Sequence, residues 1–341
     1  MRSAGARRVG HAGGRATEPL RGGRRPARGA RRASAERSAG RARLTRAQAA
    51  AVALLCDHGR VEAGDRSLPI AVFDSGVGGL TVLHECLVSL PHEDFVYLGD
   101  TARFPYGDRA PAELRAFALE LAERLVSDGA KLLVVACNSA TSAALPELRK
   151  AFADRVPVVS VVGPESRLAA AVTRSGRVGL LATAATVASG AYGEALAAAA
   201  PGAKLHPVAC PELAPLIQAG NEVDADLVTL VEEYCAPLRR AEVDTVILGC
   251  THYPLVRPML QRALGRGVTL VTAGEAIADE IERELLAADL ESPPERRGSY
   301  RFLSSGDVDE FRRLGTRFLQ LPLGEVRRIE VSGGTRRSRA A

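Results

Sequence analysis

The sequence has no run of about 20 strongly apolar residues, and its six cysteines include no Cys-x-x-Cys pair. Without such a run, no segment is predicted to span a membrane. Without paired cysteines or a secretion signal, structural disulfides are not expected and the thiols are predicted to stay reduced. The cysteines are Cys56, Cys86, Cys137, Cys210, Cys235 and Cys250.

The chain beyond residue 50 lacks an excess of positive charge. Residues 1–50 hold 14 arginines against Glu18 and Glu36, a net charge of +12, so in a chain of +5 overall the remainder carries −7. No basic nucleic-acid-binding face is therefore predicted for the remainder. The N-terminal segment is rich in Arg, Ala and Gly and has no periodic pattern of apolar residues. This composition predicts a disordered extension over residues 1–65. The alternatives are a transit peptide, a misplaced start codon and a short helix between Thr45 and Gly59.

Strand-like and helix-like segments alternate from Pro69 onward. A length of 341 residues allows about two domains. The alternation predicts parallel sheets with crossover helices, two of which are expected at 112–127 and 226–240. The predicted strands are Ile70–Phe73, Phe95–Leu98, Leu132–Ala136, Val158–Val162, Val178–Leu181, His206–Ala209, Val246–Leu248 and Val268–Val271.

A weak internal repeat supports two related halves. The strand ending at Asp74 is similar to the one ending at Thr183, at an offset of 109 residues, and Cys137 and Cys250 are offset by 113. Two such halves would each direct a strand-end turn toward a shared cleft. Chance similarity among buried strands is the alternative. The pattern predicts two pseudo-symmetric, doubly wound parallel-sheet α/β domains with the active site in the cleft between them.

A glycine-rich turn follows the first predicted strand at Asp74-Ser75-Gly76-Val77-Gly78-Gly79. Free amides at the start of a helix favour a carboxylate or a phosphate. The turn lacks the Lys-Ser/Thr ending of a P-loop and the G-x-G-x-x-G pattern of dinucleotide sites, so a merely tight turn is an equal alternative. Asp74 at the strand end suggests proton transfer or an ammonium partner.

Two thiols lie in equivalent strand-to-helix turns, Cys137-Asn138-Ser139-Ala140-Thr141 and Cys250-Thr251-His252. A helix N-terminus lowers the pKa of a thiol, whereas deep burial raises it. Opposed thiols could exchange a proton at a carbon centre from two faces. A small core residue is the alternative reading of each cysteine. Zinc is a further alternative at Cys250 and His252, but the nearest additional ligands, His206 and Cys210, lack ligand spacing, so no metal is predicted.

Several further motifs occur in a characteristic order along residues 68–322. They are Phe73-Asp74-Ser75-Gly76-Val77-Gly78-Gly79, Pro105-Tyr106-Gly107, Ala136-Cys137-Asn138-Ser139-Ala140-Thr141, Thr186-Val187-Ala188-Ser189-Gly190-Ala191-Tyr192, Cys210-Pro211, Gly249-Cys250-Thr251-His252-Tyr253-Pro254-Leu255 and Ser305-Gly306-Asp307. Together they resemble the glutamate racemase family, a group of cofactor-independent amino-acid racemases. Each motif is modest, but the ordered set is specific.

The resemblance implies that Cys137 removes the Cα proton of D-glutamate and Cys250 that of L-glutamate. It implies that Asp74 assists Cys137 and that His252 assists Cys250. The implied substrate contacts are Asp74, Ser75, Pro105, Tyr106, Gly107, Cys137, Asn138, Ser139, Thr186, Cys250, Thr251 and His252. No pyridoxal or other cofactor is expected, and the only lysines, Lys131, Lys150 and Lys204, lie in no evident catalytic turn.

Two positions depart from the usual pattern of the family. Ser139 stands where Thr is common, which keeps the hydroxyl, and Gln218 stands where many members carry Glu, which removes a charge.

The domains are expected at 68–162 plus 273–325 and at 163–272, followed by a basic tail over 326–341.

The resemblance implies that the product is D-glutamate for peptidoglycan. The expected protein is a cytoplasmic homodimer that acts on a small molecule, with no membrane and no specific nucleic acid as partner. A racemase of another amino acid, such as aspartate, is the nearest alternative. A non-catalytic binding protein with a vestigial site is the alternative from another class.

Overall fold

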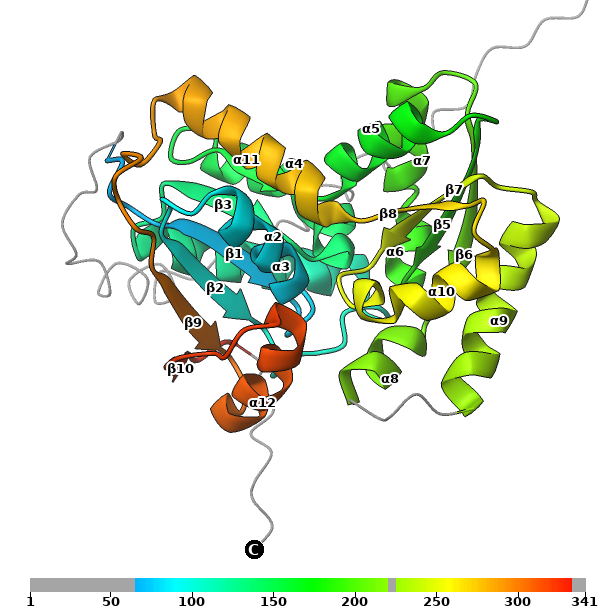
Figure 1. Ribbon diagram of the computed structural model, residues 1–341. Helices are drawn as coiled ribbons and strands as arrows, with labels where there is room; N and C mark the ends of the chain where they lie inside the picture. Colours follow the sequence, from blue (N-terminus) through cyan, green and yellow to red (C-terminus); the bar gives the residue numbers. More distant parts are fainter. Residues whose placement is uncertain (1–64, 220–224, 333–341) are drawn as a thin grey trace, which may run out of the picture. The chain divides into compact units, whose positions relative to one another are not determined.

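The computed structural model describes residues 65–219 and 225–332, apart from the side chain of Glu275 (Figure 1). Most of the predicted extension, with the proposed helix between Thr45 and Gly59, lies outside the described residues, as does the end of the chain from 333. Among the described residues, no helix combines the length and apolar character needed to cross a membrane.

The first sheet has six parallel strands in the order β10-β9-β2-β1-β3-β4, of which all but β4 are labelled in Figure 1. Its strands alternate with helices along the chain, and its central strands are buried along their whole length, as expected of a parallel sheet covered on both faces. The strands are β1 (Ile70–Asp74), β2 (Phe95–Gly99), β3 (Leu132–Val135), β4 (Val158–Ser160), β9 (Tyr300–Ser304) and β10 (Val326–Arg328).

The second sheet has four parallel strands in the order β6-β5-β7-β8. It is built from the middle of the chain, so the first sheet is completed by segments on both sides of it in the sequence. The strands are β5 (Arg177–Ala182), β6 (Lys204–Ala209), β7 (Thr245–Gly249) and β8 (Thr269–Val271). The chain thus has the two-region α/β architecture that the sequence predicted, and the exact domain boundaries stay a prediction.

Helices connect successive strands, as parallel pairing requires. They are α2 (Leu80–Ser89), α3 (Pro111–Ser127), α4 (Asn138–Phe152), α5 (Val162–Val172), α6 (Ala184–Ser189), α7 (Ala191–Ala199), α8 (Leu213–Ala219), α9 (Ala225–Arg240), the 3₁₀ helix η1 (Tyr253–Val256), α10 (Arg257–Leu264), α11 (Ala273–Ala288) and α12 (Val308–Leu319). Both helices predicted as examples, at 112–127 and 226–240, match α3 and α9 within one residue at each end.

The strand order changes direction at one point in each sheet. β1 lies between β2 and β3, and β5 lies between β6 and β7, so successive connections leave each central strand toward opposite edges. Ligands of open α/β sheets bind outside the carboxyl ends of the strands at such a point. The turns after β1 and β3 and those after β5 and β7 are therefore the places to look for a site.

Most strand boundaries differ from the sequence prediction by one or two residues, and two differences are larger in consequence. β4 ends at Ser160, because Val161 and Val162 begin the next helix. β9 was not predicted, and the basic tail predicted from 326 is wrong at its start, because Val326–Arg328 pair with β9 as β10. Ile329, the next residue along the chain, is buried. A three-residue strand with two consecutive arginines resembles a charged tail when its pairing partner is not known.

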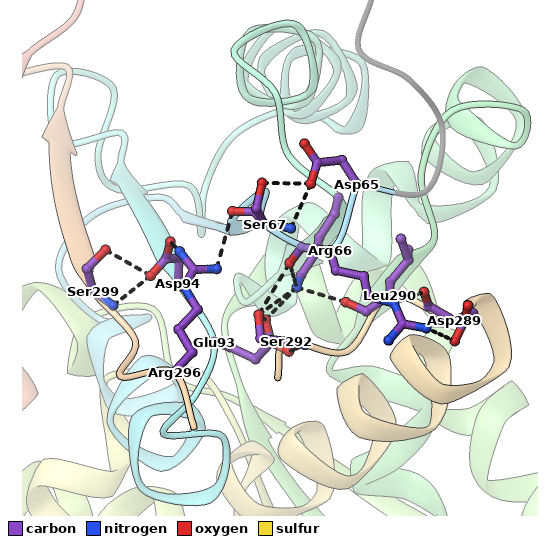
Figure 2. A network of polar contacts seen from close by, with 11 residues as sticks. Asp65, Arg66, Ser67, Glu93, Asp94, Asp289, Leu290, Ser292, Arg296 and Ser299 are labelled. Atoms are coloured by element: carbon purple, nitrogen blue, oxygen red, sulfur yellow. Dashed lines mark hydrogen bonds and ion pairs between the residues drawn. The ribbon is translucent and has the colours of Figure 1, made fainter. Parts of the chain in front are cut away.

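A buried ion pair joins distant segments at the amino end of the first sheet. Lys131 Nζ lies 2.6 Å from Glu93 Oε2 and donates to the carbonyl oxygen of Leu290 at 2.8 Å. Ser292 donates from its backbone N–H to Glu93 Oε1 at 2.7 Å. Figure 2 shows Glu93 and Ser292 within a wider polar network that includes Arg66. The network holds the segment before β1 against the segment that leads into β9.

Candidate active site

One pocket, with about 410 Å³ of empty space, receives side chains from the strand ends of both sheets. Cys137 and Cys250, which follow β3 and β7, both lie in its wall. The wall consists of Ser75, Phe104, Pro105, Tyr106, Gly107, Asp108, Cys137, Asn138, Ser139, Thr183, Pro211, Ala214, Pro215, Gly249, Cys250 and Thr251. Two thiols from equivalent turns of two sheets thus border the same space.

Cys137 is the N-cap residue of α4. Its Sγ accepts a hydrogen bond from the backbone N–H of Ala140 at 3.5 Å, which places the thiol at the positive end of the helix. The residue is only 4 % exposed. Burial raises the pKa of the Cys137 thiol to about 12, and the nearby carboxylate of Asp74 adds to this increase. The Cys137 thiol is therefore neutral at pH 7.

Cys250 lies beside an imidazole. Its Sγ is 3.8 Å from Nδ1 of His252, two residues further along the chain. Burial raises the pKa of Cys250 well above the usual value, and burial lowers the pKa of His252 to about 3. A neutral imidazole therefore faces a neutral thiol, and Nδ1 is placed to exchange a proton with the sulfur.

Asp74 is fully buried at the end of β1. Its Oδ1 accepts from the backbone N–H of Gly76 at 3.0 Å, and its Oδ2 accepts from Oγ1 of Thr251 at 3.2 Å. Burial raises the pKa of Asp74 to about 6. The carboxylate thus bonds to the turn that carries Cys250, and its charge raises the pKa of both Cys137 and Cys250.

Gly78 allows these two turns to approach each other. A Cβ at this position would lie 2.4 Å from Oγ1 of Thr251 and 2.5 Å from the ring of His252. Contacts this short are not tolerated, so a side chain here would push the Cys250 turn away. The glycine-rich motif therefore serves close approach between the turns after β1 and β7.

Three hydroxyl groups connect the turn after β3 with the turn after β5. Oγ of Ser139 lies 2.9 Å from Oγ1 of Thr183 and 3.3 Å from Oγ1 of Thr186. Thr183 caps α6 by accepting from the backbone N–H of Thr186. The hydroxyls can rotate, so they can donate to a carboxylate in the pocket.

The loop that carries Pro105, Tyr106 and Gly107 is held from behind by Asp100. The fully buried carboxylate of Asp100 accepts from Nε of Arg103 and from Oγ of Ser305, each at 2.6 Å, and from the hydroxyl of Tyr106. The ends of β2 and β9 thereby fix the loop. These buried, charge-assisted hydrogen bonds hold the loop in its position at the pocket.

Nine of the twelve residues expected to contact substrate lie in the pocket wall. Asp74, Thr186 and His252 do not; they are buried behind it and contact residues of the wall. Residues of the wall that sequence reasoning missed include Thr183, Phe104 and Asp108. Thr183 could have been found, because it follows a predicted strand and precedes Ala-Ala-Thr as a helix cap.

Within the described ranges, no group of three or more His, Cys, Asp or Glu side chains is arranged to hold a metal ion. The zinc alternative would use Cys210 as a ligand. Its Sγ instead donates a hydrogen bond to the carbonyl oxygen of Val208 at 3.6 Å. The pocket wall contains no lysine that could hold pyridoxal. Lys131 is engaged in its buried pair with Glu93, and Lys150 and Lys204 are exposed.

Comparison with known proteins gives a consistent assignment. Residues 81–281 match the family model described as Asp/Glu/Hydantoin racemase. The glutamate racemase of Beutenbergia cavernae is 46 % identical over 276 residues, covering 78 % of this chain and 94 % of that protein. The glutamate racemase of Mycobacterium tuberculosis is 45 % identical over 265 residues, covering 77 % and 97 %.

Solved structures agree with the sequence relatives. Glutamate racemase isoform RacE1 from Bacillus anthracis has a TM-score of 0.73 at 35 % identity, covering 79 % of this chain and 99 % of that one. The Francisella tularensis glutamate racemase in complex with D-glutamate has a TM-score of 0.72 at 29 % identity, covering 78 % and 98 %. The chain therefore belongs to the Asp/Glu/hydantoin racemase family, and within it to the glutamate racemases.

Proposed function

We propose that this chain interconverts L- and D-glutamate by proton transfer between two thiols, without a cofactor. The observation that carries the proposal is that Cys137 and Cys250, from equivalent turns of two sheets, line one pocket. Family membership supports glutamate as the substrate, because the similar proteins carry that name.

In the direction from D- to L-glutamate, the thiolate of Cys137 takes the Cα proton, and the thiol of Cys250 gives its proton to the opposite face. The products are L-glutamate, a neutral Cys137 and a Cys250 thiolate. The reverse reaction exchanges the two roles. In the direction from L- to D-glutamate, Nδ1 of His252, which lies 3.8 Å from Sγ of Cys250, accepts the proton of this thiol and leaves the thiolate that takes the Cα proton.

Burial opposes ionisation of both thiols. The substrate's ammonium group brings a positive charge into the pocket, which favours a thiolate beside it. The substrate's carboxylates meet the hydroxyls of Ser139 and Thr183 and the backbone amides at the strand ends. These donors stabilise the negative charge that spreads from Cα into the α-carboxylate when the proton leaves.

Other parts of the proposal rest on the sequence resemblance. The D-glutamate would supply peptidoglycan synthesis in the cytoplasm, and the chain would act as a homodimer with no specific nucleic-acid partner. The domains would comprise 68–162 plus 273–325 and 163–272.

Solvent deuterium incorporation tests the activity directly. The full chain is incubated with D- or L-glutamate in deuterated water, and Cα exchange is followed by NMR together with optical rotation. Exchange with loss of optical activity is expected for glutamate, with aspartate far slower. Faster exchange of aspartate would reassign the substrate. No exchange with either amino acid would leave a binding protein with a vestigial site.

A further inference from the structure

Glu165 is a carboxyl group buried behind the substrate pocket, and the proposed proton transfer does not use it. It lies in the first turn of α5 with no exposed surface. Burial raises its pKa to about 8. Its Oε1 has no hydrogen-bond partner within the described part of the chain. Burying a carboxyl group costs free energy unless hydrogen bonds compensate for the lost contact with water.

The other oxygen, Oε2, is the centre of a triangle of side chains. It accepts from Nδ2 of Asn138 at 3.2 Å and from the hydroxyl of Tyr192. Nδ2 of Asn138 also donates to the hydroxyl oxygen of Tyr192 at 2.6 Å. The triangle joins α4, α5 and α7, and Asn138 directly follows Cys137.

This triangle determines which way the Asn138 amide faces. The hydroxyl proton of Tyr192 is directed to Oε2 of Glu165, and a proton on the carboxyl belongs to Oε1, which contacts no polar group in the described chain. Neither neighbour therefore offers a donor to the amide oxygen of Asn138. Both N–H groups of the amide are used on this side. The oxygen is then the end left for the substrate pocket, whose wall includes Asn138.

The ammonium group of an amino acid is a donor only, and it needs acceptors when it is buried. We infer that Glu165 is a positioning residue that fixes the Asn138 amide with its oxygen toward the pocket, where it accepts an N–H from the substrate's ammonium group. This inference rests on the proposed function. Without Glu165, the amide could turn and present donors to a group that cannot accept.

A pair of variants of nearly equal side-chain length separates this role from simple packing. Glu165→Met removes the acceptor, and Glu165→Gln keeps a carbonyl oxygen that can accept from Asn138 and Tyr192. Two constants are measured for each protein: KM for glutamate, and the inhibition constant of glutarate, which has both carboxylates but no amino group. Ser166→Ala, a fully buried polar neighbour whose hydroxyl has no partner in the described chain, is the matched control.

For Glu165→Met we expect a rise in KM of about tenfold, the size of one lost hydrogen bond. The inhibition constant of glutarate should stay within about twofold, since glutarate lacks the group that the amide oxygen contacts. Glu165→Gln should remain within about threefold of the unmodified chain in both constants, and Ser166→Ala should leave both unchanged.

Equal weakening of glutamate and glutarate by Glu165→Met would overturn the inference, because it would indicate general damage to the pocket. An unchanged KM would overturn it as well. If Glu165→Met does not fold, Tyr192→Phe serves in its place, with the same selective loss expected and a parallel loss contradicting the inference. Failure of the unmodified chain to exchange deuterium at Cα of glutamate is a separate result, which counts against the proposed function.

Discussion

Nε2 of His252 lies 3.0 Å from the amide oxygen of Gln218. An amide oxygen can only accept, so Nε2 carries the ring proton and Nδ1 is left as an acceptor facing the thiol of Cys250. The pair thus selects the tautomer in which His252 can receive a proton from Cys250. Gln218 and His252 are 34 residues apart in the sequence, so local sequence patterns predict neither their contact nor the tautomer of His252.

Gln218→Glu is expected to raise the pKa of His252, because a carboxylate beside the imidazole favours its charged form by about 1–2 pH units. The pH profile of kcat/KM should then shift, and by different amounts in the two directions, since His252 serves only Cys250. Gln218→Met, which has no acceptor, is the control. Profiles of Gln218→Glu that coincide with those of the unmodified chain would show that charge at this position is irrelevant.

Cys137→Ser and Cys250→Ser should each reduce racemisation by at least about 10³-fold in both directions, because a serine hydroxyl is far less acidic than a thiol. Cys235→Ala is the matched control, since Cys235 is buried in α9 outside the pocket. Initial rates from each enantiomer provide the measurement. Near-normal rates for either serine variant would rule out the two-thiol mechanism.

Thr183→Val is expected to raise KM for glutamate by about 3–10-fold, because one hydroxyl donor is lost from the cluster with Ser139 and Thr186. The melting temperature should fall by a few degrees as well, because Thr183 also caps α6 and loss of such a cap costs about 1 kcal/mol. Thr229→Val, on the exposed face of α9, should affect neither quantity. A KM that stays at its original value in Thr183→Val would mean that substrate carboxylates bind elsewhere in the pocket.

Lys131→Met should destabilise the protein by about 3–5 kcal/mol, because it leaves Glu93 buried without its cationic partner. The loss is measured as the change in the free energy of unfolding in urea. Arg124→Ala, which breaks the exposed pair with Asp128, should cost less than about 1 kcal/mol. Similar losses in the two variants would contradict a special role for the buried pair shown in part in Figure 2.

The charge of Asp74 should make stability depend on pH. Burial raises the folded-state pKa of Asp74 from 3.8 to about 6, so the folded protein binds this proton more tightly than the unfolded chain. The associated stabilisation is present below pH 3.8 and is lost as the pH rises through 6. Relative to the unmodified chain, Asp74→Asn should therefore gain up to about 3 kcal/mol between pH 4 and pH 7. Urea unfolding across this range measures the difference, and a constant difference would refute the expected titration.

Local sequence was sufficient for the positions of the strand-end turns. The buried strands before Asp74, Cys137 and Cys250 are short apolar runs followed by helix-capping residues, and such patterns depend on neighbours only a few positions away. For the same reason α3 and α9 were predicted almost to the residue. Strand β10 was missed because its apolar content is small and its partner, β9, is more than 20 residues away.

The sequence by itself determined the alternation of strands and helices, the two thiols at strand ends and the family to which they belong. Only the tertiary structure decided that Thr183 lies within hydrogen-bond distance of Ser139, that Asp74 bonds to Thr251, and that Glu165 holds Asn138. These pairs are 44, 177 and 27 residues apart. Contacts of this kind depend on how the two sheets pack at their carboxyl ends, and the local pattern of apolar residues does not predict that packing.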